Sequence, residues 1–307
     1  MIISASRRTD IPSYFGKWFV NRLKAGFVLI QNPYNALRLS KVLLSPDITD
    51  CIVFWTKNPA PMFNELDQIT DLGYHYYFQY TLTPYGETWE HNLPSIEKRI
   101  ESFYMLAEKL GKHRIVWRYD PIILNDTFSV QYHIEKFSFL CEKICHHADE
   151  CIISFVDSYF HNHNIVSPIS YEQMQIIGQV FSKIARSYSI NLSTCAEKID
   201  LQQYGIGHAS CIDKKRIEKI VGCPIASKKD SGQRPECGCI ESIDVGTYET
   251  CLNGCKYCYA TKNPMRAKCN IRRHEPDSPM LIGRPNDDMI ITEKKVSSLK
   301  ATQMSFL

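Results

Sequence analysis

The chain has 307 residues, of which 44% are hydrophobic and 22% are charged, so it is long enough for one large α/β domain with an appendage. Its net charge of +3 is too small to indicate nucleic-acid binding by itself. It has no stretch of about 18 apolar residues that would cross a membrane, and its first residues, MIISASRRTD, lack a signal-peptide pattern. We therefore expect a cytoplasmic protein.

Six short apolar runs, each followed by a longer amphipathic stretch, predict six strand–helix units. The runs are almost continuously apolar and rich in β-branched and aromatic residues, as in strands buried on both faces. Helical periodicity is clearest in 93–111, 131–147 and 173–187, and a hairpin is expected within 28–44 with its turn at 32–35. Repeated units of this kind predict a parallel sheet with right-handed crossovers. The predicted strands are 1–6, 51–56, 76–82, 114–120, 151–157 and 189–195.

We expect this α/β sheet to form an incomplete (β/α)6 barrel, similar to a TIM barrel, in residues 1–222. A cysteine-rich cluster-binding segment and a C-terminal arm would follow in 223–307. Polar side chains come after every predicted strand, and a parallel barrel gathers its carboxyl strand ends on one face, where active sites are built. A doubly wound sheet is the other arrangement that this alternation allows.

The residues at these strand ends are candidates for catalysis and for binding a cofactor or substrate. The adjacent Arg7 and Arg8 suggest that the substrate carries an anionic group, because guanidinium groups match carboxylate or phosphate. Helix capping is the alternative role for Asp10. The candidates are Arg7, Arg8, Asp10, Lys57, Gln79, Arg118 and Asp120.

From residue 195 onward the chain holds nine of its thirteen cysteines. Thiols this dense, in a chain without an export signal, indicate metal binding before disulfides. Cys251, Cys255 and Cys258 form a C-x3-C-x2-C array, which supplies three ligands. A structural zinc ion takes four ligands, whereas three thiolates on a [4Fe–4S] cluster leave one iron open for chemistry. We therefore predict an iron–sulfur cluster here, with zinc as the alternative.

Four other cysteines are candidates for a second metal site. Cys195 ends the last predicted strand, and Cys211, Cys237 and Cys239 follow it. Together they would complete a four-thiolate set, as a closed electron-relay cluster or as a structural zinc site. The alternative for Cys195 and Cys211 is that they are buried thiols without a metal.

The stretch CLNGCKYC (251–258) resembles the signature of radical S-adenosylmethionine (SAM) enzymes, including an aromatic residue, Tyr257, before the third cysteine. CKYCYA is especially similar to the spore photoproduct lyase branch. The resemblance implies a partial barrel of six strands and a [4Fe–4S] cluster whose open iron binds SAM. Electron transfer from the cluster then cleaves SAM and yields a 5′-deoxyadenosyl radical. It also implies an electron donor such as a flavodoxin or ferredoxin, and Tyr257 would lie against the adenine.

The chain departs from that superfamily at two places. The cysteine array follows all six predicted strands, whereas the superfamily places it after the first strand. The superfamily's Gly-Gly-Glu stretch after the second strand, which contacts the methionine amino group, is replaced here by TKNPAP (56–61). Lys57, Asn58 or Gln79 would then have to bind that part of the cofactor.

Over nearly its full length the chain also resembles the prokaryotic family called domain of unknown function 1848. The matching stretches are ISASRRTDIP, FWTKNP, YYFQYTLTPYG, WRYDPI and CGCIESIDVGTYETCLNGCKYCYA. This resemblance implies membership and no particular reaction. Taken together, we expect an iron–sulfur redox enzyme of the radical SAM type.

Two alternatives remain open at this point. One is a zinc or iron–sulfur module without SAM chemistry, which binds nucleic acid or senses redox state. The other is an iron–sulfur lyase that uses the open iron as a Lewis acid.

Overall fold

An eight-stranded parallel sheet forms the centre of the molecule. The computed structural model describes residues 1–157, 162 and 164–301. The strand order is β10-β1-β4-β5-β6-β7-β8-β9, and every neighbouring pair is parallel. The strands are β1 (Ile2–Ala5), β4 (Cys51–Thr56), β5 (Tyr76–Thr81), β6 (Ile115–Ile122), β7 (Glu150–Phe155), β8 (Asn191–Cys195), β9 (Gly207–Ala209) and β10 (Ile243–Asp244).

The six predicted strands are β1 and β4 to β8, and their parallel arrangement is confirmed. The sheet is wider than predicted, because β9 and β10 add one strand at each edge. These strands have three and two residues, which is too short for an alternating pattern to stand out in the sequence. Within this sheet β1 and β4 to β9 follow one another in chain order, and β10 lies at the edge beside β1.

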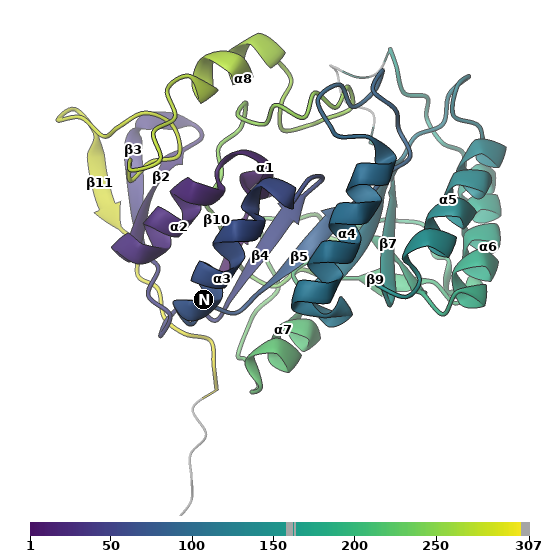
Figure 1. Ribbon diagram of the computed structural model, residues 1–307, viewed down its shortest axis with the longest axis horizontal. Coiled ribbons are helices and arrows are strands. Elements are labelled where there is room, and N and C mark those ends of the chain that lie inside the picture. The colour runs from purple at the N-terminus through teal and green to yellow at the C-terminus, as the bar shows by residue number, and fades with distance from the viewer. Residues whose placement is uncertain (158–161, 163, 302–307) are drawn as a thin grey trace, which may run out of the picture.

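Helices connect the strands and cover the sheet. Ser95, Ser129 and Ser170 cap the three longest helices, because each side chain accepts a hydrogen bond from a backbone N–H three residues further on. In Figure 1, α3 and α4 lie in front of β4 and β5, and α5 and α6 lie at the right-hand side of the molecule. The helices are α1 (Ile11–Tyr14), α2 (Gly16–Ala25), α3 (Phe63–Asp71), α4 (Ile96–Leu110), α5 (Val130–Ile144), α6 (Tyr171–Ser187), α7 (Lys214–Val221) and α8 (Pro264–Ile271).

Both faces of the sheet are buried, which explains why the strand sequences are almost continuously apolar. Phe54, Phe78 and Trp117 belong to the core between the sheet and the helices. Val53 and Tyr77 belong to a second core on the other face, which is completed by residues of α7 and of the segment that follows it.

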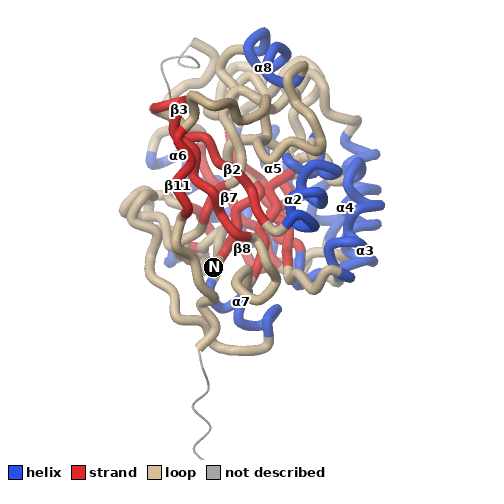
Figure 2. Tube along the Cα trace, turned by 90° about the vertical axis from the view of Figure 1, so that its left-hand side faces the viewer, coloured by secondary structure: helices blue, strands red, loops and turns tan. Residues whose placement is uncertain are grey.

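A smaller sheet packs beside the large one. β2 (Phe27–Asn32) and β3 (Asn35–Leu43) form the predicted antiparallel hairpin, and β11 (Ile290–Glu293) pairs in parallel with β3. Figure 2 shows these three strands on the side of the molecule away from α3 and α4. Among the described residues, no helix is both long enough and apolar enough to span a membrane.

Candidate functional site

A cavity of about 790 Å³ lies at the carboxyl ends of the parallel strands. This volume falls in the usual range for a site that binds a small molecule. Six of the seven candidate strand-end residues line it, and so do all seven candidate cysteine ligands. These residues are Arg7, Arg8, Asp10, Lys57, Arg118, Asp120, Cys195, Cys211, Cys237, Cys239, Cys251, Cys255 and Cys258.

Two candidates, Gln79 and Asn58, are not part of the cavity lining. Gln79 is fully buried in β5, where its amide nitrogen donates to the carbonyl oxygen of Cys211 at 2.7 Å. The strand continues to Thr81, which does line the cavity. Gln79 is two residues earlier on the same face of the strand, so it lies one layer deeper in the sheet than Thr81. The backbone N–H of Asn58 donates to the Thr56 hydroxyl, and its carbonyl accepts from the Ser13 hydroxyl.

The loop that carries Cys251, Cys255 and Cys258 is fastened by the asparagine inside it. The side-chain amide of Asn253 donates to Asp10 at 3.0 Å, and its oxygen accepts from the Tyr14 hydroxyl at 2.8 Å. Its backbone carbonyl accepts from the N–H of Asn92 at 3.1 Å. These contacts attach the loop to both the segment after β1 and the segment after β5.

The Asp10 carboxylate holds three parts of the chain together. Besides Asn253, it accepts hydrogen bonds from the backbone N–H of Lys57 at 2.9 Å and of Ser13 at 3.0 Å. It therefore also caps α1, as the alternative reading of the sequence expected. Burial raises the pKa of Asp10, although these hydrogen bonds oppose the shift.

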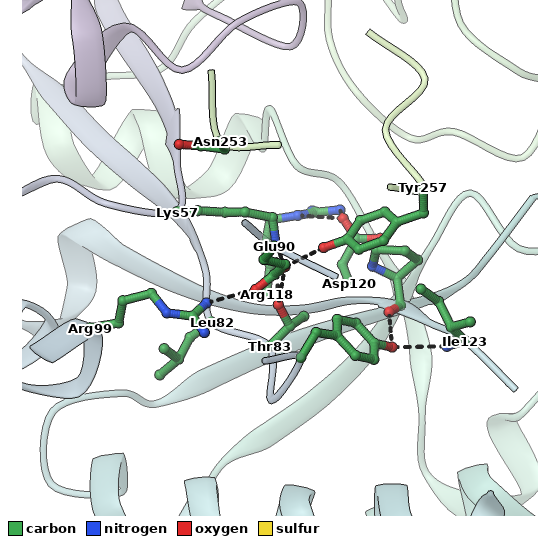
Figure 3. Close-up of polar contacts among 12 residues, drawn as sticks. Lys57, Leu82, Thr83, Glu90, Arg99, Arg118, Asp120, Ile123, Asn253 and Tyr257 are labelled. Atoms are coloured by element: carbon green, nitrogen blue, oxygen red, sulfur yellow. Dashed lines mark hydrogen bonds and ion pairs between the residues drawn. The ribbon is translucent and has the colours of Figure 1, made fainter. Parts of the chain in front are cut away.

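Glu90 is a buried charged residue beside the cysteine loop, in contact with Lys57 and Tyr257, which line the cavity. Its carboxylate accepts from Lys57 at 2.9 Å, from Arg99 at 3.1 Å and from the Thr83 hydroxyl at 2.9 Å. It also accepts from the Tyr257 hydroxyl, and Figure 3 shows these side chains pointing toward it. Burial alone would raise the pKa of Glu90, but the charges of Lys57 and Arg99 bring it below its ordinary value. Glu90 is therefore a buried anion.

Sequence reasoning missed Glu90, which lies four residues beyond the YYFQYTLTPYG stretch (76–86) that carries part of the family resemblance. Glu90 lies in the loop between β5 and α4, where the sequence has no helical or strand periodicity that would indicate a buried residue. Tyr257, the aromatic residue of the cysteine array, lines the cavity and packs edge-to-face on Tyr85 with ring centroids 5.7 Å apart.

The three thiols of the array are held as neutral groups by their surroundings. Burial raises the pKa of Cys251, with Asp10 and the other two sulfurs adding to the effect. Burial and then Glu90 raise the pKa of Cys255, and burial raises that of Cys258. A bound metal would supply the positive charge that thiolates need in this setting.

Two arginines approach the other four cysteines. Arg118 donates to the Cys211 sulfur at 2.7 Å and to Asp120 at 2.6 and 3.1 Å. Burial alone would lower the pKa of Arg118, but Asp120 and the sulfurs of Cys211 and Cys195 raise it well above its ordinary value. The guanidinium groups of Arg7 and Arg118 lie 5.2 and 5.4 Å from the ring centroid of Trp55.

Asp244 is a second residue that sequence reasoning missed. Its carboxylate accepts hydrogen bonds from the Ser4 and Ser6 hydroxyls and from the backbone N–H groups of Arg7 and Gly246. It thereby fixes the loop that carries Arg7 and Arg8. The signal was weak, because Asp244 belongs to a strand of only two residues.

Glu197 adds a group that titrates near neutrality at the cavity. Its carboxylate accepts from the backbone N–H of Phe155 at 2.8 Å. Burial, with smaller contributions from Asp157 and Asp120, raises the pKa of Glu197 to about 7. The side chain therefore holds a proton for part of the time at physiological pH.

Within the described part of the chain, no group of three or more His, Cys, Asp or Glu side chains is arranged as a ready metal centre. Among the other four cysteines, the sulfurs of Cys195 and Cys211 are 2.9 Å apart.

Comparison with known proteins identifies the family but no activity. No curated protein matches the chain. A putative α-L-fucosidase from Bacteroides thetaiotaomicron VPI-5482 is 13% identical, with a TM-score of 0.28 over 73% of this chain and 83% of that one. A short-chain dehydrogenase from Oenococcus oeni PSU-1 is 10% identical, with a TM-score of 0.25 over 72% of this chain and 85% of that one. The family model described as "Domain of unknown function (DUF1848)" matches residues 2–260, and the chain belongs to that family.

Proposed function

We propose that the protein is an iron–sulfur redox enzyme of the radical SAM type, with a [4Fe–4S] cluster on Cys251, Cys255 and Cys258. One observation carries the proposal: these three thiols line the same cavity as the charged residues at the strand ends. A cluster held there by three thiolates keeps one iron accessible to a molecule in the cavity. When bound, the cluster and SAM would supply one-electron radical chemistry that amino-acid side chains lack.

The residues around the array suit such a group. Asn253 holds the loop in place through Asp10 and Tyr14, so the three thiols are positioned before any metal arrives. Lys57 lies near the array, and its charge opposes the rise in pKa of Cys255 and Cys258. Lys57 also lines the cavity, where we propose that it binds the carboxylate of SAM.

Arg8 is our candidate for binding an anionic group of the substrate. Arg118 is paired with Asp120 and Lys57 with Glu90, and Arg7 lies 3.8 Å from Asp230. Arg8 lines the cavity with its guanidinium 5.2 Å from the ring centroid of Tyr248, and no ion pair is formed to it by the described residues. The substrate itself would therefore carry an anionic group.

We also propose that the eight-stranded sheet curves into an incomplete barrel whose mouth is the cavity. Strands β1 and β4 to β9 follow one another in chain order, as barrel strands do, without the reversal of a doubly wound sheet. The side chains at the six predicted strand ends then face one space. A chain with thirteen cysteines suits a reducing compartment such as the cytoplasm.

An acidic electron-donor protein, such as a flavodoxin or ferredoxin, would dock on the surface around α8. Residues 250–274 contain six Lys or Arg and no Asp or Glu. In this basic surface Met265 is 67% exposed and Tyr259 is 45% exposed, so apolar groups lie among the cations. The Glu249 carboxylate accepts from the N–H groups of Lys262 and Asn263, which fixes α8 beside the cysteine loop. In Figure 1, α8 lies at the top of the molecule, and the N-terminus lies in its lower half.

The test is anaerobic reconstitution with iron and sulfide, followed by reduction with dithionite in the presence of SAM. We expect about four irons bound at the array, a change in the cluster's spectrum on adding SAM, and release of 5′-deoxyadenosine. Cys255→Ser should abolish all three results, whereas Cys269→Ser, a cysteine exposed on α8, should leave them unchanged. Wild-type protein that binds the cluster but neither responds to SAM nor releases 5′-deoxyadenosine would refute the SAM part. Protein that binds only zinc at the array would refute the whole proposal.

A further inference from the structure

Four thiols from distant parts of the chain meet at one place on the cavity wall. Cys195 ends β8, Cys211 follows β9, and Cys237 and Cys239 precede β10. The sulfurs of Cys195 and Cys211 are 2.9 Å apart, and the Cys239 thiol has hydrogen bonds with those of Cys211 and Cys237. Cys211, Cys237 and Cys239 are each at least 94% buried. These four residues are called the four-cysteine site below.

The surroundings of the four-cysteine site favour negative charge on sulfur. Arg118 donates to the Cys211 sulfur at 2.7 Å, and the backbone N–H of Ile212 donates to that of Cys239 at 3.3 Å. Arg7 also faces these sulfurs, and its Nη2 is buried with no hydrogen-bond partner among the described residues. Four neutral thiols would leave this buried guanidinium nitrogen unsatisfied, which is costly.

We infer that Cys195, Cys211, Cys237 and Cys239 bind one zinc ion. Four thiolates around a divalent ion carry a net charge of −2, which the nearby guanidinium groups of Arg7 and Arg118 would partly offset. Tetrahedral Zn–S bonds of about 2.3 Å place their sulfurs about 3.8 Å apart, so the 2.9 Å separation has to open by less than about 1 Å. A [4Fe–4S] cube would require the sulfurs to move much farther apart.

The ion would join the two edges of the large sheet. Cys195 and Cys211 belong to the β8–β9 edge, whereas the segment with Cys237 and Cys239 runs into β10, the strand at the other edge. A hydrogen bond already connects these parts, from the backbone N–H of Ile240 to the carbonyl of Ile212 at 3.2 Å. With all four ligands supplied by protein, the zinc ion is structural. It fixes the wall that carries Arg7 and Arg118.

The test separates the four-cysteine site from the array by using a chain without the array, Cys251→Ala/Cys255→Ala/Cys258→Ala. After anaerobic purification we expect one zinc ion per chain by elemental analysis, both in this triple variant and in the wild type. Adding Cys237→Ser/Cys239→Ser to the triple variant should reduce the zinc content to a background level. The matched control, Cys223→Ser/Cys269→Ser, changes two cysteines outside the cavity lining and should keep the zinc.

Three results would overturn the inference. They are iron and sulfide in place of zinc in the triple variant, metal-free protein, or a Cys195–Cys211 disulfide in peptides from anaerobically prepared protein. A second measurement applies if the added substitutions prevent folding. The triple variant produced with cobalt should show the absorption bands of tetrahedral Co²⁺ bound to thiolates, and octahedral cobalt or none would contradict the site. Neither result depends on the array, so the zinc site and the proposed function can fail separately.

Discussion

The side-chain amide of Asn253 donates a hydrogen bond to the buried Asp10 carboxylate at 3.0 Å, across 243 positions of the chain. This contact fixes the cysteine array to the segment that follows the first strand. It explains how an array at the far end of the sequence lines a cavity built from strand ends. The position of the array after all six predicted strands is thus no obstacle to a site at those ends.

Replacing Asn253 should loosen the array and destabilise the fold. In Asn253→Ala the Asp10 carboxylate loses a donor while staying buried, which costs about 1–3 kcal/mol. We expect a loss of that size in the free energy of unfolding, measured anaerobically in denaturant, together with weaker cluster binding on reconstitution. Asn191→Ala, at an exposed position that begins β8, should change neither. Equal effects of the two substitutions would show that the Asn253 contact does not hold the array.

The Glu90 carboxylate should matter more for stability than the acidic groups that line the cavity, because it is the shared buried anion of two cations. Glu90→Gln leaves Lys57 and Arg99 without their shared anion in a buried place, and breaking such a pair costs about 3–5 kcal/mol. Tyr257→Phe removes one hydrogen bond to the same carboxylate and should cost about 1.5–3 kcal/mol. Thermal and denaturant unfolding would measure both. Glu87→Gln, at a nearby exposed position, should have almost no effect, and a similar loss there would contradict this account.

The sequence was most informative where burial dictates a pattern. Apolar runs identified the six central strands because both sheet faces are covered, as at Phe54 and Val53. β9 and β10 were not predicted, because strands of three and two residues are held by their neighbours rather than by a pattern of their own.

Candidate site residues were predictable where they directly follow a strand, as Arg7 and Lys57 do. Gln79 lies within its strand, two residues before Thr81 at the strand's end, and does not reach the cavity. Strand ends predicted from sequence are not accurate enough to distinguish these two positions. Glu90 and Asp244 form contacts with residues far away in the sequence. No local sequence pattern predicts which carboxylates form such contacts.

The basic surface around α8 should govern electron delivery by an acidic donor protein. Arg266→Glu/Lys268→Glu reverses two charges there, so we expect the rate of cluster reduction by a flavodoxin to fall at least about tenfold at low salt. Reduction by dithionite should be unchanged, because that small molecule needs no docking surface. Lys215→Glu/Lys219→Glu changes the charge equally on α7, at the opposite end of the molecule, and serves as the control. If both pairs slow the donor equally, net charge rather than this surface is responsible.

His133 should make the fold less stable in mild acid. The imidazole is fully buried and contacts the Tyr119 hydroxyl at 2.8 Å and the Ile123 carbonyl at 2.7 Å. Burial lowers the pKa of His133 to about 4, from about 6.5 in an unfolded chain.

Because the unfolded chain binds the proton more readily, the stability that His133 contributes is complete above about pH 6.5 and is lost as the pH falls toward about 4. The full loss corresponds to about 3 kcal/mol. We expect His133→Gln to be less stable than the wild type at pH 7 but to lose less stability between pH 6.5 and 4, when unfolding in denaturant is followed across that range. His113→Gln removes a histidine that is 58% exposed, and it should keep the wild-type slope. An unchanged slope in His133→Gln would mean that the acid sensitivity of the fold originates elsewhere, in the carboxylates around the cavity.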